Sequence, residues 1–185
     1  NSMNVSVAPN QMISTTFGMI GRDMTISATE LTNGATGISS AGESEPFDSY
    51  SGDIKIANSG ASLGSGLTLI TSLDFTLSNN LTSTLVIGEE TASDVLAGRA
   101  EVEGTLTAYF EDASLINRFL DETESAIEFS VQDNSSNSMT FLFPRVKFNS
   151  ADAGVEGPDA RIVNMSFVGL YDATEATSLK ITRSA

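Results

Sequence analysis

Hydrophobic and polar residues alternate with period two along much of the chain, a pattern typical of β-strands with one buried and one exposed face. The clearest predicted strand spans residues 99–110. Its apolar face carries Ala100, Val102, Leu106, Ala108 and Phe110 with Gly104 in phase, and its polar face carries Glu101, Glu103, Thr105, Thr107 and Tyr109. Similar alternation predicts strands over 67–77, 127–132, 139–148 and 161–171. We therefore expect a mainly β fold, an antiparallel β-sandwich or barrel.

Three features mark where these strands end or shift. The polar pair Asn79-Asn80 predicts a turn between one strand and a short second strand. The polar run 133–138 predicts a hairpin turn. The apolar positions change phase around Pro144, and because proline cannot donate to a sheet ladder, we expect a bulge or an edge position there.

One short helix is predicted to follow the strand at 99–110. Asp112 or Ser114 would accept hydrogen bonds from the free N–H groups of its first turn. Its apolar stripe consists of Leu115, Ile116, Phe119 and Leu120. The acidic residues that follow at 121–124 oppose the helix dipole and predict an early end. We expect this helix to flank the sheet and close its open end.

The segment 33–51 differs from the rest because it is rich in glycine, serine and acidic residues and has few apolar ones. A structureless stretch of this length in a compact domain is either functional or disordered. We take it as a candidate contact with a neighbouring subunit, against the alternative of a mobile surface loop. The candidate residues are Asn33, Gly34, Gly37, Gly42, Phe47 and Tyr50. No linker divides the chain, so we expect a single domain over residues 1–185.

Composition argues against an enzyme. The 185 residues include no histidine, cysteine or tryptophan, which removes the usual general base, thiolate chemistry and the usual zinc ligands. The run 133–137 offers oxygen ligands at alternate positions, but it lacks the central glycine and the glutamate of a calcium loop. We therefore predict neither a catalytic site nor a cofactor nor a metal.

The net charge of the chain argues against some classes of binding partner. The chain carries 24 acidic and 9 basic residues, a formal net charge of −15, which disfavours binding to nucleic-acid phosphates and to anionic membranes. Glu101 and Glu103 share a strand face that is either ordinary solvent-exposed surface or, in a ring of copies, the lining of a pore. A lining of like charge would let DNA slide through without adhering.

The order of the parts resembles the tail tube proteins of long-tailed bacteriophages. The resemblance covers Val5-Ser6-Val7-Ala8-Pro9-Asn10, Phe17-Gly18-Met19-Ile20-Gly21, 73–88, 98–112 with its helix, Phe141-Leu142-Phe143-Pro144-Arg145-Val146, and the closing strand pair to Arg183. It implies a β-sandwich or barrel with one short flanking α-helix and no catalytic residues. Relatives of this type have a sizeable segment before the strand at 5–7, so we expect this chain to be a fragment that lacks an N-terminal segment.

The resemblance also implies how the protein works. Subunits would self-associate into hexameric rings, and stacked rings would form a DNA channel in the virion tail after synthesis in the cytoplasm of the host bacterium. Glu101 and Glu103 would face the lumen, the segment 33–51 would lie between subunits, and the tape measure and other tail proteins would be further partners. DNA would be only a non-sticking cargo, and no membrane is involved.

A second interpretation is an acidic β-sandwich binding or adhesin module on a virion or cell surface. The two interpretations predict different surfaces. A tube subunit has sheet edges that neighbours complete and one acidic sheet face, whereas an adhesin protects its edges and concentrates its character in loop tips.

Overall fold

The computed structural model describes residues 1–24, 26, 47–50, 52–64, 70–110, 113–133, 137–154 and 161–184. Within these residues the chain forms eleven strands and one helix. The strands are β1 (Ser2–Val7), β2 (Ser14–Gly18), β3 (Asp53–Asn58), β4 (Ile70–Ser78), β5 (Thr82–Thr84), β6 (Asp94–Leu96), β7 (Glu101–Tyr109), β8 (Ser125–Gln132), β9 (Ser138–Asp152), β10 (Ile162–Gly169) and β11 (Lys180–Ser184). The helix α1 is Ser114–Leu120.

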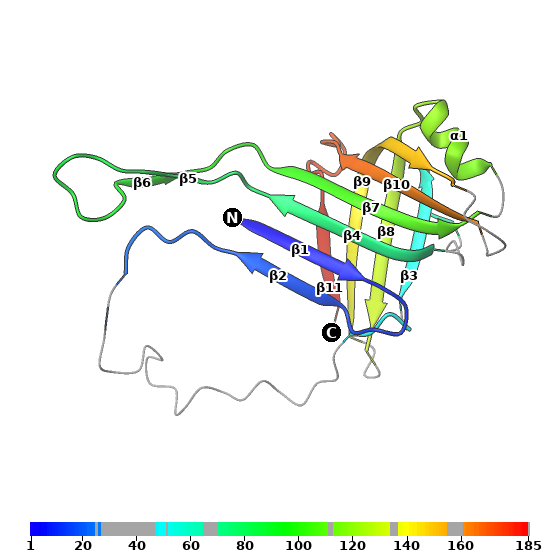
Figure 1. Cartoon of the computed structure of the whole chain (residues 1–185), viewed down its shortest axis with the longest axis horizontal. Coiled ribbons are helices and arrows are strands. Elements are labelled where there is room, and N and C mark those ends of the chain that lie inside the picture. The colour runs from blue at the N-terminus through cyan, green and yellow to red at the C-terminus, as the bar shows by residue number, and fades with distance from the viewer. Residues whose placement is uncertain are drawn as a thin grey trace.

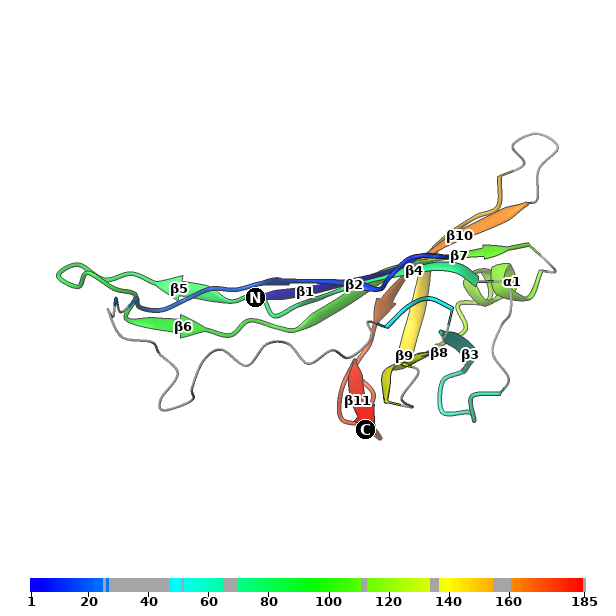
Figure 2. The same ribbon diagram turned by 90° about the horizontal axis from the view of Figure 1, so that it is seen from below.

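Nine of these strands form one curled antiparallel sheet in the order β2-β1-β4-β7-β10-β9-β8-β3, with β11 paired to β9. Strands β2, β1, β4, β7 and β10 make one layer, which we call the front layer. Strands β8, β3 and β11 lie behind it and make the back layer (Figures 1 and 2). The prediction of a mainly β antiparallel fold with one short helix is confirmed. The two layers are the two halves of one curled sheet, a half-barrel.

The sheet turns from one layer to the other within β9. Residues 138–142 of this strand pair with β11, while residues 146–152 pair with β10. Between these parts the register with β8 slips: Ile127 lies opposite Phe143, but Ser125 lies opposite Val146. Three steps along β9 thus match two along β8, so the predicted bulge at Pro144 is confirmed. The slip lets Phe143 and Val146 both face the core, where each is fully buried.

The core lies between the two layers and is built largely from phenylalanine rings. Phe143 stands edge-on to Phe75 and Phe167, with ring centroids 4.9 Å and 5.6 Å away. The ring of Phe167 occupies the space beside Gly104, where an added Cβ would lie 2.4 Å from Phe167 Cζ and 2.7 Å from the Asp74 carbonyl oxygen. Position 104 faces the core but has no room for a side chain, because the Phe167 ring occupies that space.

The helix is where it was predicted, and of its two candidate capping residues Asp112 lies outside the described residues. Ala113 occupies the N-cap position and makes no side-chain capping bond, and Ser114 is the first residue of the helix. The helix packs against β9, and Arg118 ties it to the back layer by donating from Nη1 to Asn58 Oδ1 at 2.8 Å and to Ser125 Oγ at 3.0 Å. Leu120, assigned to the apolar stripe, is exposed.

The short second strand predicted after Asn79-Asn80 is β5, but the predicted turn does not reverse the chain. Asn80 has φ +49°, a left-handed conformation that asparagine tolerates, but the chain continues outward into β5 and returns through β6. Because β5 pairs with β6, residues 79–100 extend the β4–β7 hairpin as an arm that projects beyond the sheet (Figure 1).

Two other strand predictions need correction. The strand predicted over 161–171 is shorter in the structure: β10 ends at Gly169, and Tyr171 beyond it is exposed. Strand β3 was not predicted, although Ile54, Ile56 and Ala57 contribute to the core or pack against it. Positions 67–69 of the predicted strand 67–77 lie outside the described residues.

Replacing Gly104 with alanine tests the close approach of Phe167. The new methyl group must displace a buried ring and a neighbouring carbonyl, so Gly104→Ala is expected to lower the free energy of unfolding by about 1–3 kcal/mol. Gly21→Ala is the control, because nothing lies within 4 Å of its Cβ position. Equal stability of the two variants in urea unfolding would contradict this packing.

A bidentate ion pair holds the residue that follows Pro144. Arg145 donates from Nε and Nη2 to the two carboxylate oxygens of Glu124 at 2.9 Å and 2.6 Å. These hydrogen bonds lower the pKa of Glu124 and raise that of Arg145. The ionised Glu124 therefore stabilises the fold above its unfolded pKa of about 4.3, and this stabilisation is lost as the pH falls through the lower folded-state pKa.

We expect Glu124→Gln to lower the melting temperature at pH 7, with a difference from the unmodified chain that disappears in acid. Melting curves from pH 7 down to pH 3 measure it, with Glu89→Gln on the arm as the control. A difference that is independent of pH would mean that the ion pair is not its source.

Candidate functional site

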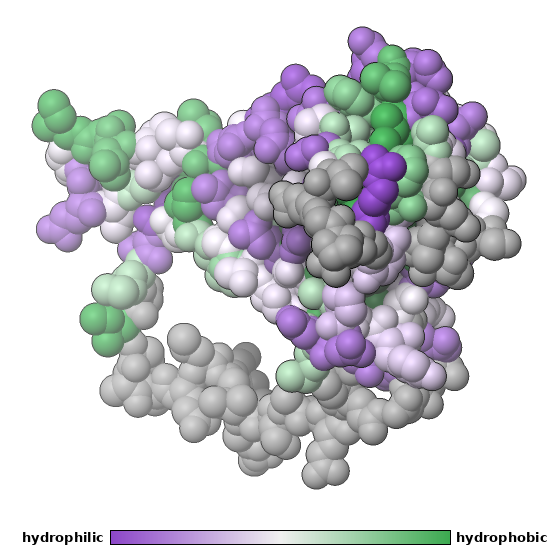
Figure 3. All heavy atoms as spheres, turned by 45° about the vertical axis from the view of Figure 1, so that its right-hand side comes forward, coloured by the Kyte–Doolittle hydropathy of each residue, from purple (hydrophilic) through white to green (hydrophobic). Residues whose placement is uncertain are grey.

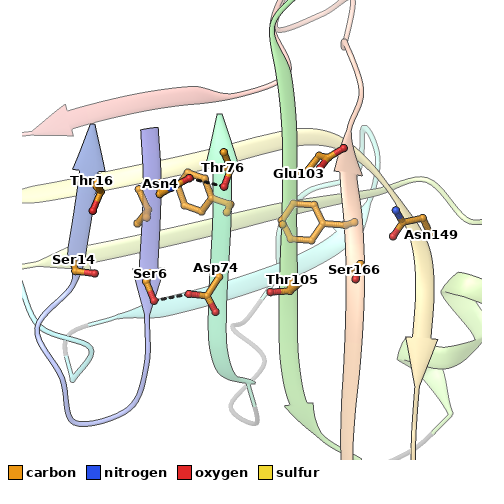
Figure 4. Close-up of a pocket in the computed structure, with 14 residues that line it drawn as sticks. Asn4, Ser6, Ser14, Thr16, Asp74, Thr76, Glu103, Thr105, Asn149 and Ser166 are labelled. Atoms are coloured by element: carbon orange, nitrogen blue, oxygen red, sulfur yellow. Dashed lines mark hydrogen bonds between the residues drawn. The ribbon is translucent and has the colours of Figure 1, made fainter. Parts of the chain in front are cut away.

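The alternation that buries one side of the front layer leaves polar side chains on its other side. Ten of these residues, from six strands, line a hollow of about 660 Å³. They are Ser14 and Thr16 on β2, Asn4 and Ser6 on β1, Asp74 and Thr76 on β4, Glu103 and Thr105 on β7, Ser166 on β10 and Asn149 on β9 (Figure 4). We call this surface the polar face.

Side chains on the polar face are linked across neighbouring strands. Thr76 donates to Asn4 Oδ1 at 2.6 Å, and Ser6 donates to Asp74 Oδ1 (Figure 4). Further along the same side, Thr107 donates to Asn164 Oδ1 at 3.0 Å. Each pair joins directly opposite positions on neighbouring strands, so part of the polar groups of this surface bond to one another.

The charge on the polar face is of one sign. Asp74 and Glu103 are its two charged members, and Glu101 lies on the same side of β7, where its carboxylate accepts from Asn80 Nδ2 at 3.2 Å. None of the ten residues labelled in Figure 4 is basic. Phosphate groups would therefore meet carboxylates, hydroxyls and amides here, without an ammonium or guanidinium group to bind them.

Several basic side chains are held by carboxylates elsewhere on the molecule. Lys55 on β3 lies 2.9 Å from Glu128, and this hydrogen bond raises the pKa of Lys55. Lys147, two residues from Asn149 along β9, pairs with Glu122, and that contact lowers the pKa of Glu122. The cation nearest to the polar face along β9 is thus already neutralised.

The described residues include no group of three or more Asp or Glu side chains arranged to hold a metal ion. No helix in the described ranges is long and apolar enough to span a membrane.

The sequence-predicted site residues fall into two groups. Glu101 and Glu103 lie on β7 with exposed side chains, on the side opposite the buried Val102 and Leu106. Asn33, Gly34, Gly37 and Gly42 lie outside the described residues.

The two candidate residues of this segment that the structure describes behave differently. Phe47 packs against the core, and its carbonyl accepts from Ile13 N at 3.2 Å. Tyr50 is 95% exposed. The predicted roles of these residues between subunits stay predictions.

Two surfaces were not located from the sequence, although an open sheet edge was expected of a tube subunit. The first is the outer edge of β2, which is the last strand of the sheet and has no neighbour beyond it among the described residues. The second is the arm, whose tip exposes Leu85, Val86 and Ile87. The uninterrupted apolar run at 85–87, with no polar residue to alternate with, was the available signal for the arm.

Comparison with known protein families decides what kind of protein carries these surfaces. Residues 1–169 match the family described as phage tail tube protein. The chain belongs to this family. It is therefore a structural protein of the virion tail and not an enzyme, and the family match favours a tail subunit over an acidic adhesin module.

Solved structures with similar folds also come from tail assemblies. A chain of the anti-feeding prophage baseplate is 10% identical with a TM-score of 0.52, and the match covers 71% of the tail tube chain and 91% of that chain. A chain from the tail of an empty gene transfer agent particle is 13% identical with a TM-score of 0.53, covering 73% and 98%. At these identities the likeness shows the fold alone. No curated protein sequence matches the chain.

Proposed function

We propose that the tail tube chain assembles into rings whose polar faces line a central channel for DNA. The observation that carries the proposal is the polar face itself: hydroxyl, amide and carboxylate groups spread over six strands without a basic residue. Glu101, Glu103 and Asp74 would give the channel wall its negative charge. Repulsion between these carboxylates and phosphates would prevent DNA from adhering as it passes.

The two lateral ends of the polar face differ in a way that suits ring closure. At one end, β2 presents an open edge with exposed Phe17, and open edges of this kind pair with other chains. At the other end, where β10 and β9 meet α1, Phe119, Leu120, Val168 and Leu170 line an apolar hollow of about 500 Å³. We propose that the β2 edge of one subunit meets this corner of the next.

Such a contact joins different surfaces of two copies, and a heterologous contact of this kind closes into a ring when the rotation per subunit fits. The number six is supported by the two similar structures, because the baseplate is described as 6-fold symmetrised and the gene transfer agent tail as having C6 symmetry. We therefore propose a hexamer.

The predictions for the 33–51 segment and for the tape-measure protein concern the same proposed assembly. Tyr50, a candidate residue of the 33–51 segment, is 95% exposed and could contact a neighbouring subunit. A tape-measure protein would occupy the same channel as DNA, in contact with the polar face.

A change of charge sign on the polar face tests the channel assignment. Tubes are first identified by negative-stain electron microscopy and light scattering, and sedimentation then measures how much short duplex DNA they retain. Glu103→Lys tubes are expected to retain DNA at low salt and release it as salt rises. The log–log salt slope should steepen by about 0.9 for each phosphate that the new ammonium groups neutralise.

Glu175→Lys is the matched control, because it makes the same charge change in the turn between β10 and β11, at a carboxylate that pairs with Lys180 and lines neither the polar face nor the α1 corner. Equal DNA retention by the two variants would remove the polar face from the channel. A strictly monomeric chain, even at high protein concentration, would overturn the ring itself.

A further inference from the structure

The arm exposes an apolar tip that its own chain leaves uncovered. Leu85 is 79% exposed and Ile87 is fully exposed, and apolar residues gather at the far end of the arm (Figure 3). The arm is nevertheless built as a defined element. Thr84 and Asp94 bond to each other across it in both directions at 3.0 Å, and Arg22 Nε donates to the Ala92 carbonyl at 3.2 Å.

The direction of the arm follows from the strands that carry it. The arm leaves the sheet where Ser78 of β4 pairs with Glu101 of β7, and it projects outward from that end of the layer (Figure 1). If the polar face lines a channel, this direction leads away from the ring and toward the next one.

A hollow with both apolar and polar lining residues opens at the opposite end of the same strands. It has a volume of about 290 Å³, and Val7 at the end of β1, Ile70 at the start of β4 and Phe129 on β8 are among its lining residues. The register places Val7 opposite Leu73, whereas Ser2 lies opposite Ser78 at the arm. Nine residues of β4, at roughly 3.3 Å each, separate the hollow from the arm by about 30 Å. The tip therefore cannot reach the hollow of its own chain.

Charged side chains lie at both ends, and the hollow itself is lined by Asp53, whose carboxylate lies 3.5 Å from Lys55 Nζ. The acidic pair Glu89-Glu90 follows Ile87 and Gly88 at the tip. Arg161 precedes β10 at the hollow's end of the layer, with its guanidinium 4.8 Å from the ring centroid of Phe110. β10 is two strands from β4, which places Arg161 roughly 10 Å to the side of the hollow.

We propose that the arm of one subunit inserts Leu85 and Ile87 into the hollow at Val7, Ile70 and Phe129 of a second copy in the next ring. The volume is just below the range of about 300–1,000 Å³ typical of small-molecule pockets, which suits a few side chains. The contact is head-to-tail, so it repeats along an open stack instead of closing. This inference rests on the proposed function for the direction of stacking.

Engineered cysteines test the contact, because the chain has none of its own. One population carries Ile87→Cys and a second, with a mass tag, carries Ala8→Cys at the rim of the hollow. After mixing, assembly and oxidation, we expect a disulfide-linked heterodimer on a non-reducing gel. Neighbours in a stack hold the two thiols at effective concentrations in the mM range, so its yield should exceed that of an Ile87→Cys and Thr105→Cys mixture by about tenfold or more.

The outcomes separate the two proposals. Tubes without this heterodimer, or with Ile87→Cys linked mainly to itself, would overturn the docking of the arm and leave the ring and channel intact. The absence of rings, tubes and cross-linked product together would overturn both. In the double variant Leu85→Asp/Ile87→Asp, single rings without stacks are the expected result, and stacks of normal length would contradict it.

Discussion

The structure depends on a single strand that belongs to both of its layers. Strand β9 pairs with β11 at its start and with β10 at its end, and the extra residue at the Pro144 bulge keeps both halves facing one core. Without this slip, either Phe143 or Val146 would point out of the core, because side chains alternate strictly along a regular strand. The Glu124 carboxylate holds Arg145 at the same point. The curl of the sheet therefore has a local cause.

The curl determines which surfaces remain for assembly. Once the front layer has buried one side against the back layer, its polar side is free over six strands and its last strand, β2, ends in an open edge. The arm and the hollow lie at the two ends of the same layer. In the proposed assembly, one sheet would provide the channel wall, the lateral contact and the axial contact.

Much of the fold was predictable from the sequence, because the period-two alternation that indicates a strand is a local property. Val102, Leu106 and Ala108 are buried and Glu101 and Glu103 are exposed, as the alternation at 99–110 predicts. The bulge at Pro144 was also predictable, because proline lacks the N–H that a sheet ladder needs. The course of the chain after Asn79-Asn80 was not, because either a reversal or an extension satisfies the same two residues. The choice between them depends on the pairing of Thr82 with Leu96, which lies 14 positions away.

The candidate sites were harder to predict than the fold for a related reason. The two glutamates could be placed on an exposed strand face, but the remaining members of the polar face come from strands whose order only the folded sheet shows. The hollow that we propose for the arm combines Val7, Ile70 and Phe129, which are far apart in sequence and meet at one end of the sheet. No short sequence motif indicates that these three residues lie together. The apolar run at 85–87, in contrast, is continuous in the sequence.

The central claim is that the polar face lines the channel of an assembled tube. A cryo-electron microscopy map of assembled particles, resolved well enough to trace strands, tests it most directly. We expect Asp74, Glu101 and Glu103 to point toward the tube axis, with the β2 edge of each subunit against the α1 corner of its neighbour. A map in which the polar face points outward, or is buried between subunits, would contradict the account.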